Sequence, residues 1–240
     1  MTEKMEALDR LVVALDLPDG GEALRMAERL AGRVGLFKVG LELFCAEGPG
    51  FVRRLQGLGE VFLDLKLHDI PTTVERALER LLDLDPRLIN VHAQGGPAML
   101  RAAAAAVERH RARGGRTELL AVTVLTSLDR EALAQVGHGA APAELALDLA
   151  RLAQACGCGG VVCSAHEAAA VRAACGEGFH RLTPGIRPLG EGVQDQARVM
   201  DPASALRAGS TWLVVGRPIT HAPDPAAAAA AILRSMEAAG

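Results

Sequence analysis

Short runs of β-branched and aliphatic residues alternate along the chain with longer segments rich in Ala, Leu, Arg and Glu. The short runs have the length and composition of buried strands, and the longer segments have those of helices. We predict strands at Leu11–Leu15, Leu36–Val39, Glu60–Lys66, Leu88–His92, Glu118–Leu125, Gly159–Cys163, Phe179–Thr183 and Thr211–Val215. We predict helices at Gly20–Ala31, Pro49–Gly57, Thr72–Asp83, Pro97–Arg113, Ala143–Cys156, Ala165–Cys175, Ala203–Ala208 and Pro225–Ala238. This alternation is typical of repeated βα units around a parallel sheet.

Eight such units in 240 residues fit an α/β fold of the TIM (β/α)8 barrel type, for which about 250 residues is typical. A doubly wound sheet is the alternative, and counting strands does not exclude it. No Pro/Ser-rich linker divides the chain, so we expect residues 1–240 to form a single domain.

If the fold is a TIM barrel, its chemistry should lie at the carboxyl ends of the strands and in the loops that follow. The polar residues of the chain meet this expectation. At or just after the ends of the predicted strands stand Asp16, Lys38, Asp64, Lys66, His92, Thr126, Ser127, Arg187, Gly216 and Arg217. We interpret His92 as a barrel residue whose hydrogen bonds are satisfied. We expect His68 either to face outward or to pack beside the loop that follows the strand.

The third predicted strand carries charges within an aliphatic run, VFLDLKLHDIP. Because side chains alternate along a strand, Asp64 and Lys66 point to one face about 7 Å apart, while the leucines beside them face the helices. Lys38 should reach the same mouth of the barrel, and Asp69 follows the strand, just before a helix that Pro71 can open. Buried charges need partners, so a salt-bridged core is one interpretation. The other is a site for a reaction that develops carbanionic charge and then takes up a proton.

The last two predicted strands are followed by features suited to a phosphate. Arg187, in the segment TPGIRP, can offer bidentate donors to an anion. Gly216 and Arg217 follow the eighth strand, where a backbone can approach an anion at the start of a helix. Loops after strands seven and eight are the usual phosphate site of a TIM barrel.

Composition narrows the class of partner. A formal net charge of -3 gives no electrostatic reason to expect nucleic acid or an acidic membrane surface. The five cysteines contain no C-x-x-C pair and the histidines show no metal-ligand spacing, so we expect buried structural thiols and no metal site. The chain shows no apolar leader and no long uncharged apolar run, so we expect a cytoplasmic protein that acts on a small substrate.

Seven segments occur along the chain in the order FKVGLELF, DLKLHDIPTT, VHAQGG, VLTS, TPGIRP, DQARVM and VVGRPIT. In this order they resemble the bacterial form of the orotidine 5'-phosphate decarboxylase family, over nearly the whole chain. The pattern D-x-K-x-x-D is shared by a wider group of phosphosugar barrels, whereas IPTT, GIRP and the later DQ are more specific. The resemblance implies decarboxylation of orotidine 5'-monophosphate (OMP) to UMP, the last step of pyrimidine synthesis. It also implies a homodimer with shared active sites and no metal or organic cofactor.

The resemblance also implies roles for individual residues. Lys66 would give a proton to the pyrimidine carbon that loses carbon dioxide, and Asp64 would either repel the departing carboxylate or hold Lys66 in place. Lys38 and Asp69 would complete the charge network, with Asp69 reaching the site of the partner subunit. The implied substrate contacts are Asp16 and Lys38 at the ribose, Thr126 or Ser127 at the pyrimidine, Arg187, Gln196, Gly216 and Arg217 at the phosphate, and Thr72 and Thr73 from the partner subunit.

Two other functions compete with this one. A phosphosugar decarboxylase or synthase of the same superfamily uses magnesium, but it carries a metal-binding glutamate about where Lys38 stands, and a lysine would repel the ion. A non-catalytic phosphate-binding barrel would need the loss of at least one of four charged residues. All four are present: Lys38, Asp64, Lys66 and Asp69.

Overall fold

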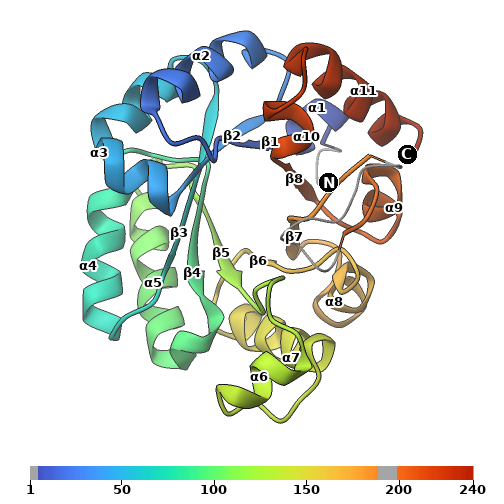
Figure 1. Ribbon diagram of the computed structural model, residues 1–240. Helices are drawn as coiled ribbons and strands as arrows, with labels where there is room; N and C mark the ends of the chain where they lie inside the picture. The colour runs from blue at the N-terminus through green and yellow to red at the C-terminus, as the bar shows by residue number, and fades with distance from the viewer. Residues whose placement is uncertain (1–4, 189–198, 240) are drawn as a thin grey trace.

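The computed structural model of the protein describes residues 5–188 and 199–239. Eight parallel strands pair in chain order and β1 pairs with β8, so the sheet closes into a barrel (Figure 1). The strands are β1 (Leu11–Ala14), β2 (Leu36–Gly40), β3 (Glu60–Leu67), β4 (Leu88–His92), β5 (Glu118–Val122), β6 (Gly160–Val162), β7 (His180–Thr183) and β8 (Trp212–Val215). The predicted TIM barrel is confirmed. The doubly wound alternative is wrong, because an open sheet would not pair its first strand with its last.

Helices surround the barrel and follow the strands. They are α1 (Ala7–Arg10), α2 (Gly20–Leu30), α3 (Leu41–Gln56), α4 (Pro71–Leu82), α5 (Gly96–Arg111), α6 (Arg130–Gln135), α7 (Pro142–Ala155), α8 (Ala168–Cys175), α9 (Pro202–Arg207), α10 (Arg217–Thr220) and α11 (Pro225–Glu237), with a 3-10 turn η1 (Ala93–Gly95). Each predicted helix is present. The short helices α1, α6 and α10, of four to six residues, were not predicted. None of the helices in the described part of the chain is long and apolar enough to cross a membrane.

Helix α3 begins at Leu41, well before the predicted start at Pro49. Gly48 interrupts the helix with φ 69°, in the left-handed region that favours glycine, and Pro49 begins the second part. The sequence signal at Gly48 and Pro49 is therefore real, but it marks a kink within the helix. Cys45 lies in the first part and is exposed, so the prediction of a buried thiol is wrong there and holds for the other four cysteines.

Two apolar layers result from the alternation of side chains along the strands. Residues such as Phe62, Leu88 and Trp212 fill the interior of the barrel. Residues on the opposite faces of the strands, such as Leu63 and Leu65, pack against the helices. Leu88 and Trp212 begin their strands and are buried, so apolar side chains fill the amino-terminal end of the barrel and leave the carboxyl end for polar groups.

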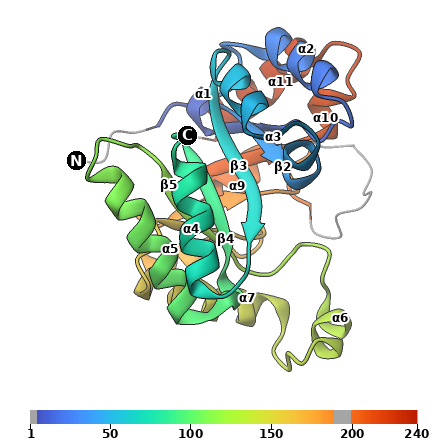
Figure 2. The ribbon, with the colours of Figure 1, turned by 90° about the vertical axis from the view of Figure 1, so that its left-hand side faces the viewer.

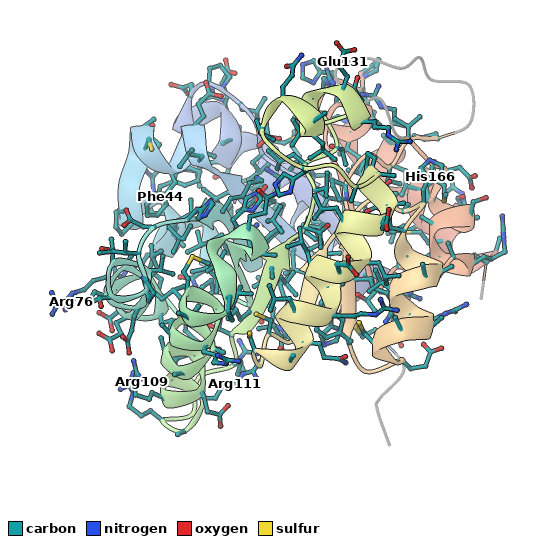
Figure 3. The ribbon with its side chains drawn as sticks, turned by 90° about the horizontal axis from the view of Figure 1, so that it is seen from below. Phe44, Arg76, Arg109, Arg111, Glu131 and His166 are labelled. Atoms are coloured by element: carbon teal, nitrogen blue, oxygen red, sulfur yellow. The ribbon has the colours of Figure 1, made fainter. Side chains whose placement is uncertain are left out.

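Helices α4 and α5 lie side by side on the outside of the barrel (Figures 1 and 2). Nη2 of Arg109, on α5, lies 2.7 Å from Oε1 of Glu75 and 2.9 Å from Oε1 of Glu79, both on α4. Arg76 and Arg109 project from the outer edge of this pair of helices (Figure 3). Exposed ion pairs of this kind contribute little to stability, so Arg109 is a suitable control for arginines of the cavity.

Candidate active site

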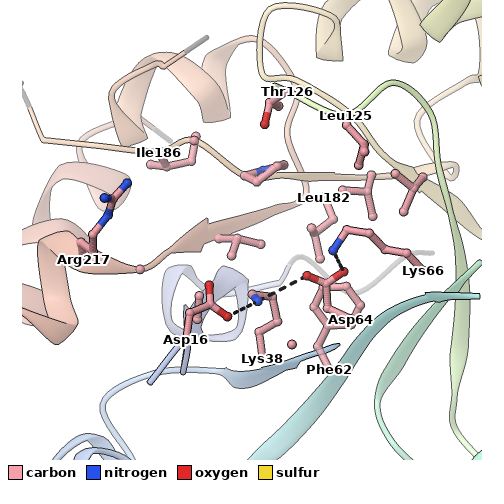
Figure 4. Close-up of a pocket in the computed structure, with 18 of the residues that line it drawn as sticks. Asp16, Lys38, Phe62, Asp64, Lys66, Leu125, Thr126, Leu182, Ile186 and Arg217 are labelled. Atoms are coloured by element: carbon pink, nitrogen blue, oxygen red, sulfur yellow. Dashed lines mark hydrogen bonds and ion pairs between the residues drawn. The ribbon is translucent and has the colours of Figure 1, made fainter. Parts of the chain in front are cut away.

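A cavity of about 670 Å³ opens at the carboxyl ends of the strands. Its volume is in the range of small-molecule sites. Eight of the predicted site residues line it: Asp16, Lys38, Asp64, Lys66, Thr126, Arg187, Gly216 and Arg217. The strand-end argument therefore located the cavity correctly. Figure 4 shows the charged residues along its floor, with Arg217 at one end and Lys66 at the other.

Four of the charged side chains form one continuous chain of ion pairs (Figure 4). Nζ of Lys38 lies 2.8 Å from Oδ1 of Asp16 and 3.3 Å from Oδ2 of Asp64. Nζ of Lys66 lies 2.7 Å from Oδ1 of Asp64. The array that the structure describes is thus Asp16–Lys38–Asp64–Lys66, in which Asp64 lies between two ammonium groups.

Lys38 and Asp64 are almost inaccessible to solvent, with 7% and 8% of their surfaces exposed. Burial by itself would raise the pKa of Asp64, but Lys38, Lys66 and hydrogen bonds from Lys66 and Asn90 outweigh it and lower the pKa below its ordinary value. Burial would likewise lower the pKa of Lys38, but Asp64 and Asp16 raise it above its ordinary value. Both groups are therefore charged at neutral pH, and the cavity holds fixed charges of both signs.

Lys66 has an unusual backbone conformation, with φ 51°, and strand β3 bulges at this point. The backbone N–H of Lys66 donates to Oδ1 of Asn90 over 2.7 Å, and Nδ2 of Asn90 donates to Oδ1 of Asp64 over 2.7 Å. Asn90 was missed by the sequence argument, which considered strand ends alone. The available signal was its position on β4 two residues from Leu88, on the face that points into the barrel.

His92, at the end of β4, stacks on His68 with ring centroids 5.3 Å apart. Its Nδ1 is buried and has no hydrogen-bond partner among the described residues, so the expectation of a satisfied histidine is wrong. Burial, and then the positive charges of His68 and Lys66, lower the pKa of His92 to about 4. His92 is therefore neutral at physiological pH. His68 is exposed, as expected.

Three of the predicted phosphate-binding residues line the cavity, and Arg217 lies at the end opposite Lys66 (Figure 4). Arg187 follows β7 and is buried, and Arg217 begins α10 directly after Gly216. Gln196, also predicted at the phosphate, lies outside the described residues.

Four predicted residues are not among those that line this cavity: Asp69, Thr72, Thr73 and Ser127. All four are exposed. Asp69 accepts a hydrogen bond from the backbone N–H of Ile70 over 2.7 Å, and Ile70 leaves 67% of its surface exposed. Of the two candidates for the pyrimidine, Thr126 faces the cavity and Ser127 does not.

Comparison with known proteins shows to which family this chain belongs. Residues 9–232 match the model of the orotidine 5'-phosphate decarboxylase / HUMPS family. The chain belongs to this family. Within it, orotidine 5'-phosphate decarboxylase of Chromohalobacter salexigens is 53% identical over 227 residues, 94% of this chain and 95% of that protein. The enzyme of the same name from Moorella thermoacetica is 51% identical over 238 residues, 98% of this chain and 94% of that protein.

A solved structure agrees with the sequence comparison. The crystal structure of orotidine 5'-phosphate decarboxylase from Lactobacillus acidophilus superposes with a TM-score of 0.84 at 36% identity, covering 94% of this chain and 98% of that one. The orotidine 5'-phosphate decarboxylase / HUMPS family thus accounts for both the barrel and the order of its motifs. Among the described residues, no three His, Cys, Asp or Glu side chains gather as a metal site.

Proposed function

We propose that the protein is an orotidine 5'-phosphate decarboxylase, which converts OMP to UMP and carbon dioxide. The observation that carries the proposal is the pair of ammonium groups, Lys38 and Lys66, on either side of the Asp64 carboxylate at the floor of the cavity. The names of the relatives support the same activity. In this proposal the reaction is the last step of pyrimidine synthesis. Residues 1–240 form one catalytic domain.

Lys66 is the proposed proton donor. When the bond between the pyrimidine ring and its carboxyl carbon breaks, the electron pair stays on the ring and carbon dioxide leaves. The ammonium group of Lys66 stabilises this developing negative charge and then transfers a proton from Nζ to the same ring carbon. Nζ is left neutral and regains a proton from solvent, to which the Lys66 side chain is partly exposed.

Two roles for Asp64 remain from the sequence argument, and the contacts favour one of them. Oδ1 of Asp64 contacts Nζ of Lys66, and Oδ2 contacts Nζ of Lys38. Both oxygens are therefore engaged in holding the two ammonium groups. We assign to Asp64 chiefly the positioning of Lys66, because repulsion of the substrate carboxylate is offset by the two neighbouring cations.

Substrate binding is proposed to extend along the cavity from the charged floor to the far end. Arg187, Arg217, Gly216 and Gln196 would hold the phosphate, Asp16 and Lys38 the ribose hydroxyls, and Thr126 the pyrimidine edge. Guanidinium groups suit this role because they bind phosphate oxygens through two parallel hydrogen bonds. Binding energy from the phosphate can then orient the reacting ring over Lys66.

We propose a homodimer in which each subunit completes the site of the other. Asp69, Thr72 and Thr73 would be the contributed residues. The support is their position: they are exposed, are not among the residues lining the cavity of their own chain, and flank the exposed apolar side chain of Ile70.

Decarboxylation is proposed to need neither metal nor organic cofactor. In the described structure the Asp64 carboxylate has ammonium groups on both of its oxygens, and these cations would repel a divalent ion.

We propose a cytoplasmic location for the protein. All five cysteines are free thiols, which fits the reduced cytoplasm. We expect no role for nucleic acid or membrane.

The proposal is tested by mixing the purified protein with OMP and following loss of the orotate absorbance, with and without EDTA. We expect turnover that EDTA does not change. Absence of turnover would overturn the proposal. Turnover that EDTA abolishes and magnesium restores would overturn the proposed cofactor-free mechanism.

A further inference from the structure

Asn90 is a buried polar residue in the wall of the barrel, behind the charged pair of the cavity. It is fully buried, at 0% exposure, and is not among the residues that line the cavity. Its Nδ2 donates to Oδ1 of Asp64, and its Oδ1 accepts from the backbone N–H of Lys66, each over 2.7 Å. These two partners fix the orientation of the amide, because a backbone N–H can only donate and an ionised carboxylate can only accept.

The two hydrogen bonds stand where the sheet loses its regular pairing. Leu63 pairs with Ile89 and Leu67 pairs with Val91, so the residues from Asp64 to Lys66 lie opposite Asn90 alone. This bulge removes the ladder partner of the Lys66 N–H, and the side chain of Asn90 supplies an acceptor in its place. The left-handed backbone of Lys66 is costly for a residue with a side chain and persists only where its surroundings hold it.

We propose that Asn90 is a positioning residue for the proposed decarboxylation: it holds the bulge that turns Lys66 toward Asp64, and it orients the Asp64 carboxylate between the two lysines. The inference rests on the proposed function, since it assigns Asn90 an effect on the reaction of Lys66. A buried amide is costly in an apolar wall unless both of its polar ends are paired. Here both are paired, and both partners belong to the catalytic pair.

The position of Asn90 predicts an effect on the chemical step and not on substrate binding. The Arg217 side chain lies at the other end of the cavity from Lys66 (Figure 4). Asn90→Ala should therefore lower kcat about 10- to 100-fold, the range expected for a lost hydrogen bond to a charged group. KM and the Kd for UMP should stay within about threefold of wild type.

Thr123 offers a matched control. It is also fully buried, directly after β5, and its hydroxyl donates to the carbonyl oxygen of Val162, the last residue of β6, over 3.0 Å. Thr123→Val removes a buried hydrogen bond of the same barrel, so it measures the cost of such a loss to stability. We expect its kcat to stay within about threefold of wild type.

Asn90→Asp separates positioning from a merely structural role, because it keeps the size of the side chain. The new carboxylate can still accept from the Lys66 N–H, but when ionised it repels Asp64 instead of donating to it. Its protonated form regains a donor. The ratio of variant to wild-type kcat should therefore rise as the pH falls from about 8 to about 5, whereas a merely structural role predicts a constant ratio.

Hydrogen exchange gives a readout that does not depend on activity. The Lys66 amide should be protected in wild type and in Asn90→Asp, which keep an acceptor, and should exchange faster in Asn90→Ala. Wild-type enzyme inactive on OMP would overturn the proposed function, and hydrogen exchange would still test the contact. Active wild type, with a flat pH ratio for Asn90→Asp or with kcat unchanged in Asn90→Ala, would overturn the role of Asn90.

Discussion

Nζ of Lys66 lies 2.7 Å from Oδ1 of Asp64, although both residues stand on strand β3 with only Leu65 between them. Two such side chains on a regular strand start about 7 Å apart. The bulge at Lys66 and the reach of its side chain close this distance. The Asp64 carboxylate and the Lys66 ammonium group therefore form one unit, in which a change to either residue should alter the other.

Arg217→Ala should weaken substrate binding more than it slows the reaction. The lost guanidinium lines the proposed phosphate end of the cavity, so we expect KM and the Kd for UMP to rise at least about tenfold. Steady-state kinetics and calorimetric titration with UMP measure both. Arg109→Ala, which removes a guanidinium from the outer face of α5, serves as the control and should leave both constants unchanged. Equal KM values in the two variants would remove Arg217 from the phosphate site.

Thr126→Val should raise KM for OMP, whereas Ser127→Ala should not. Only Thr126 lines the cavity, and the valine keeps its size while removing the hydroxyl. One lost hydrogen bond to a neutral ring predicts a rise of about three- to tenfold. Initial-rate kinetics of the two variants distinguish the candidates, and the opposite pattern would assign the contact to Ser127.

Subunit mixing should reveal the place of Asp69. Inactive Asp69→Ala and Lys66→Ala proteins should regain activity when mixed, because a hybrid dimer has one site with both residues intact. With random exchange of subunits, about a quarter of wild-type activity is expected. Mixing Asp64→Asn with Lys66→Ala is the control, since both residues belong to one site and no intact site can form. No recovery, despite exchange shown by mass spectrometry, would place Asp69 in the site of its own subunit.

His92 should make the protein less stable in mild acid. Its pKa of about 4 lies below that of an unfolded histidine, so the unfolded state binds more protons between these values. Stability should be level above about pH 6.5 and fall as the pH drops toward 4, by about 1 kcal/mol after allowance for solvent screening.

Thermal melts at about pH 7.5 and about pH 5 test this prediction on wild type and on His92→Gln. The variant should lose less stability between the two pH values. Part of the loss should remain, because burial also lowers the pKa of His180. An equal loss in both proteins would show that His92 is not the group that titrates.

The sequence was sufficient for the barrel and for much of its polar cavity. Alternating apolar runs predict strands and helices, and polar residues at strand ends predict one common site, as Asp16, Lys38 and Arg217 show. These features depend on local pattern and on the geometry of the fold class. The helix before Gly48 was missed because a glycine and a proline within a helix have the same local signature as a helix boundary.

Other features depend on contacts between distant parts of the chain. The acceptor for the Lys66 N–H comes from Asn90, on a neighbouring strand, and a register shift between strands has no local signature. The unsatisfied Nδ1 of His92 could not be predicted for the same reason. Asp69 stays a prediction, since its proposed partner is another subunit.

The role of Lys66 is tested most directly by release of labelled carbon dioxide from carboxyl-labelled OMP, measured for wild type and Lys66→Ala under saturating substrate. UMP binding and the melting temperature, measured in parallel, show whether the variant is folded and keeps its site. We expect rapid release by wild type and a rate at least about 10³-fold lower in the variant, with UMP still bound. A folded Lys66→Ala protein that releases carbon dioxide at the wild-type rate would contradict Lys66 as the proton donor.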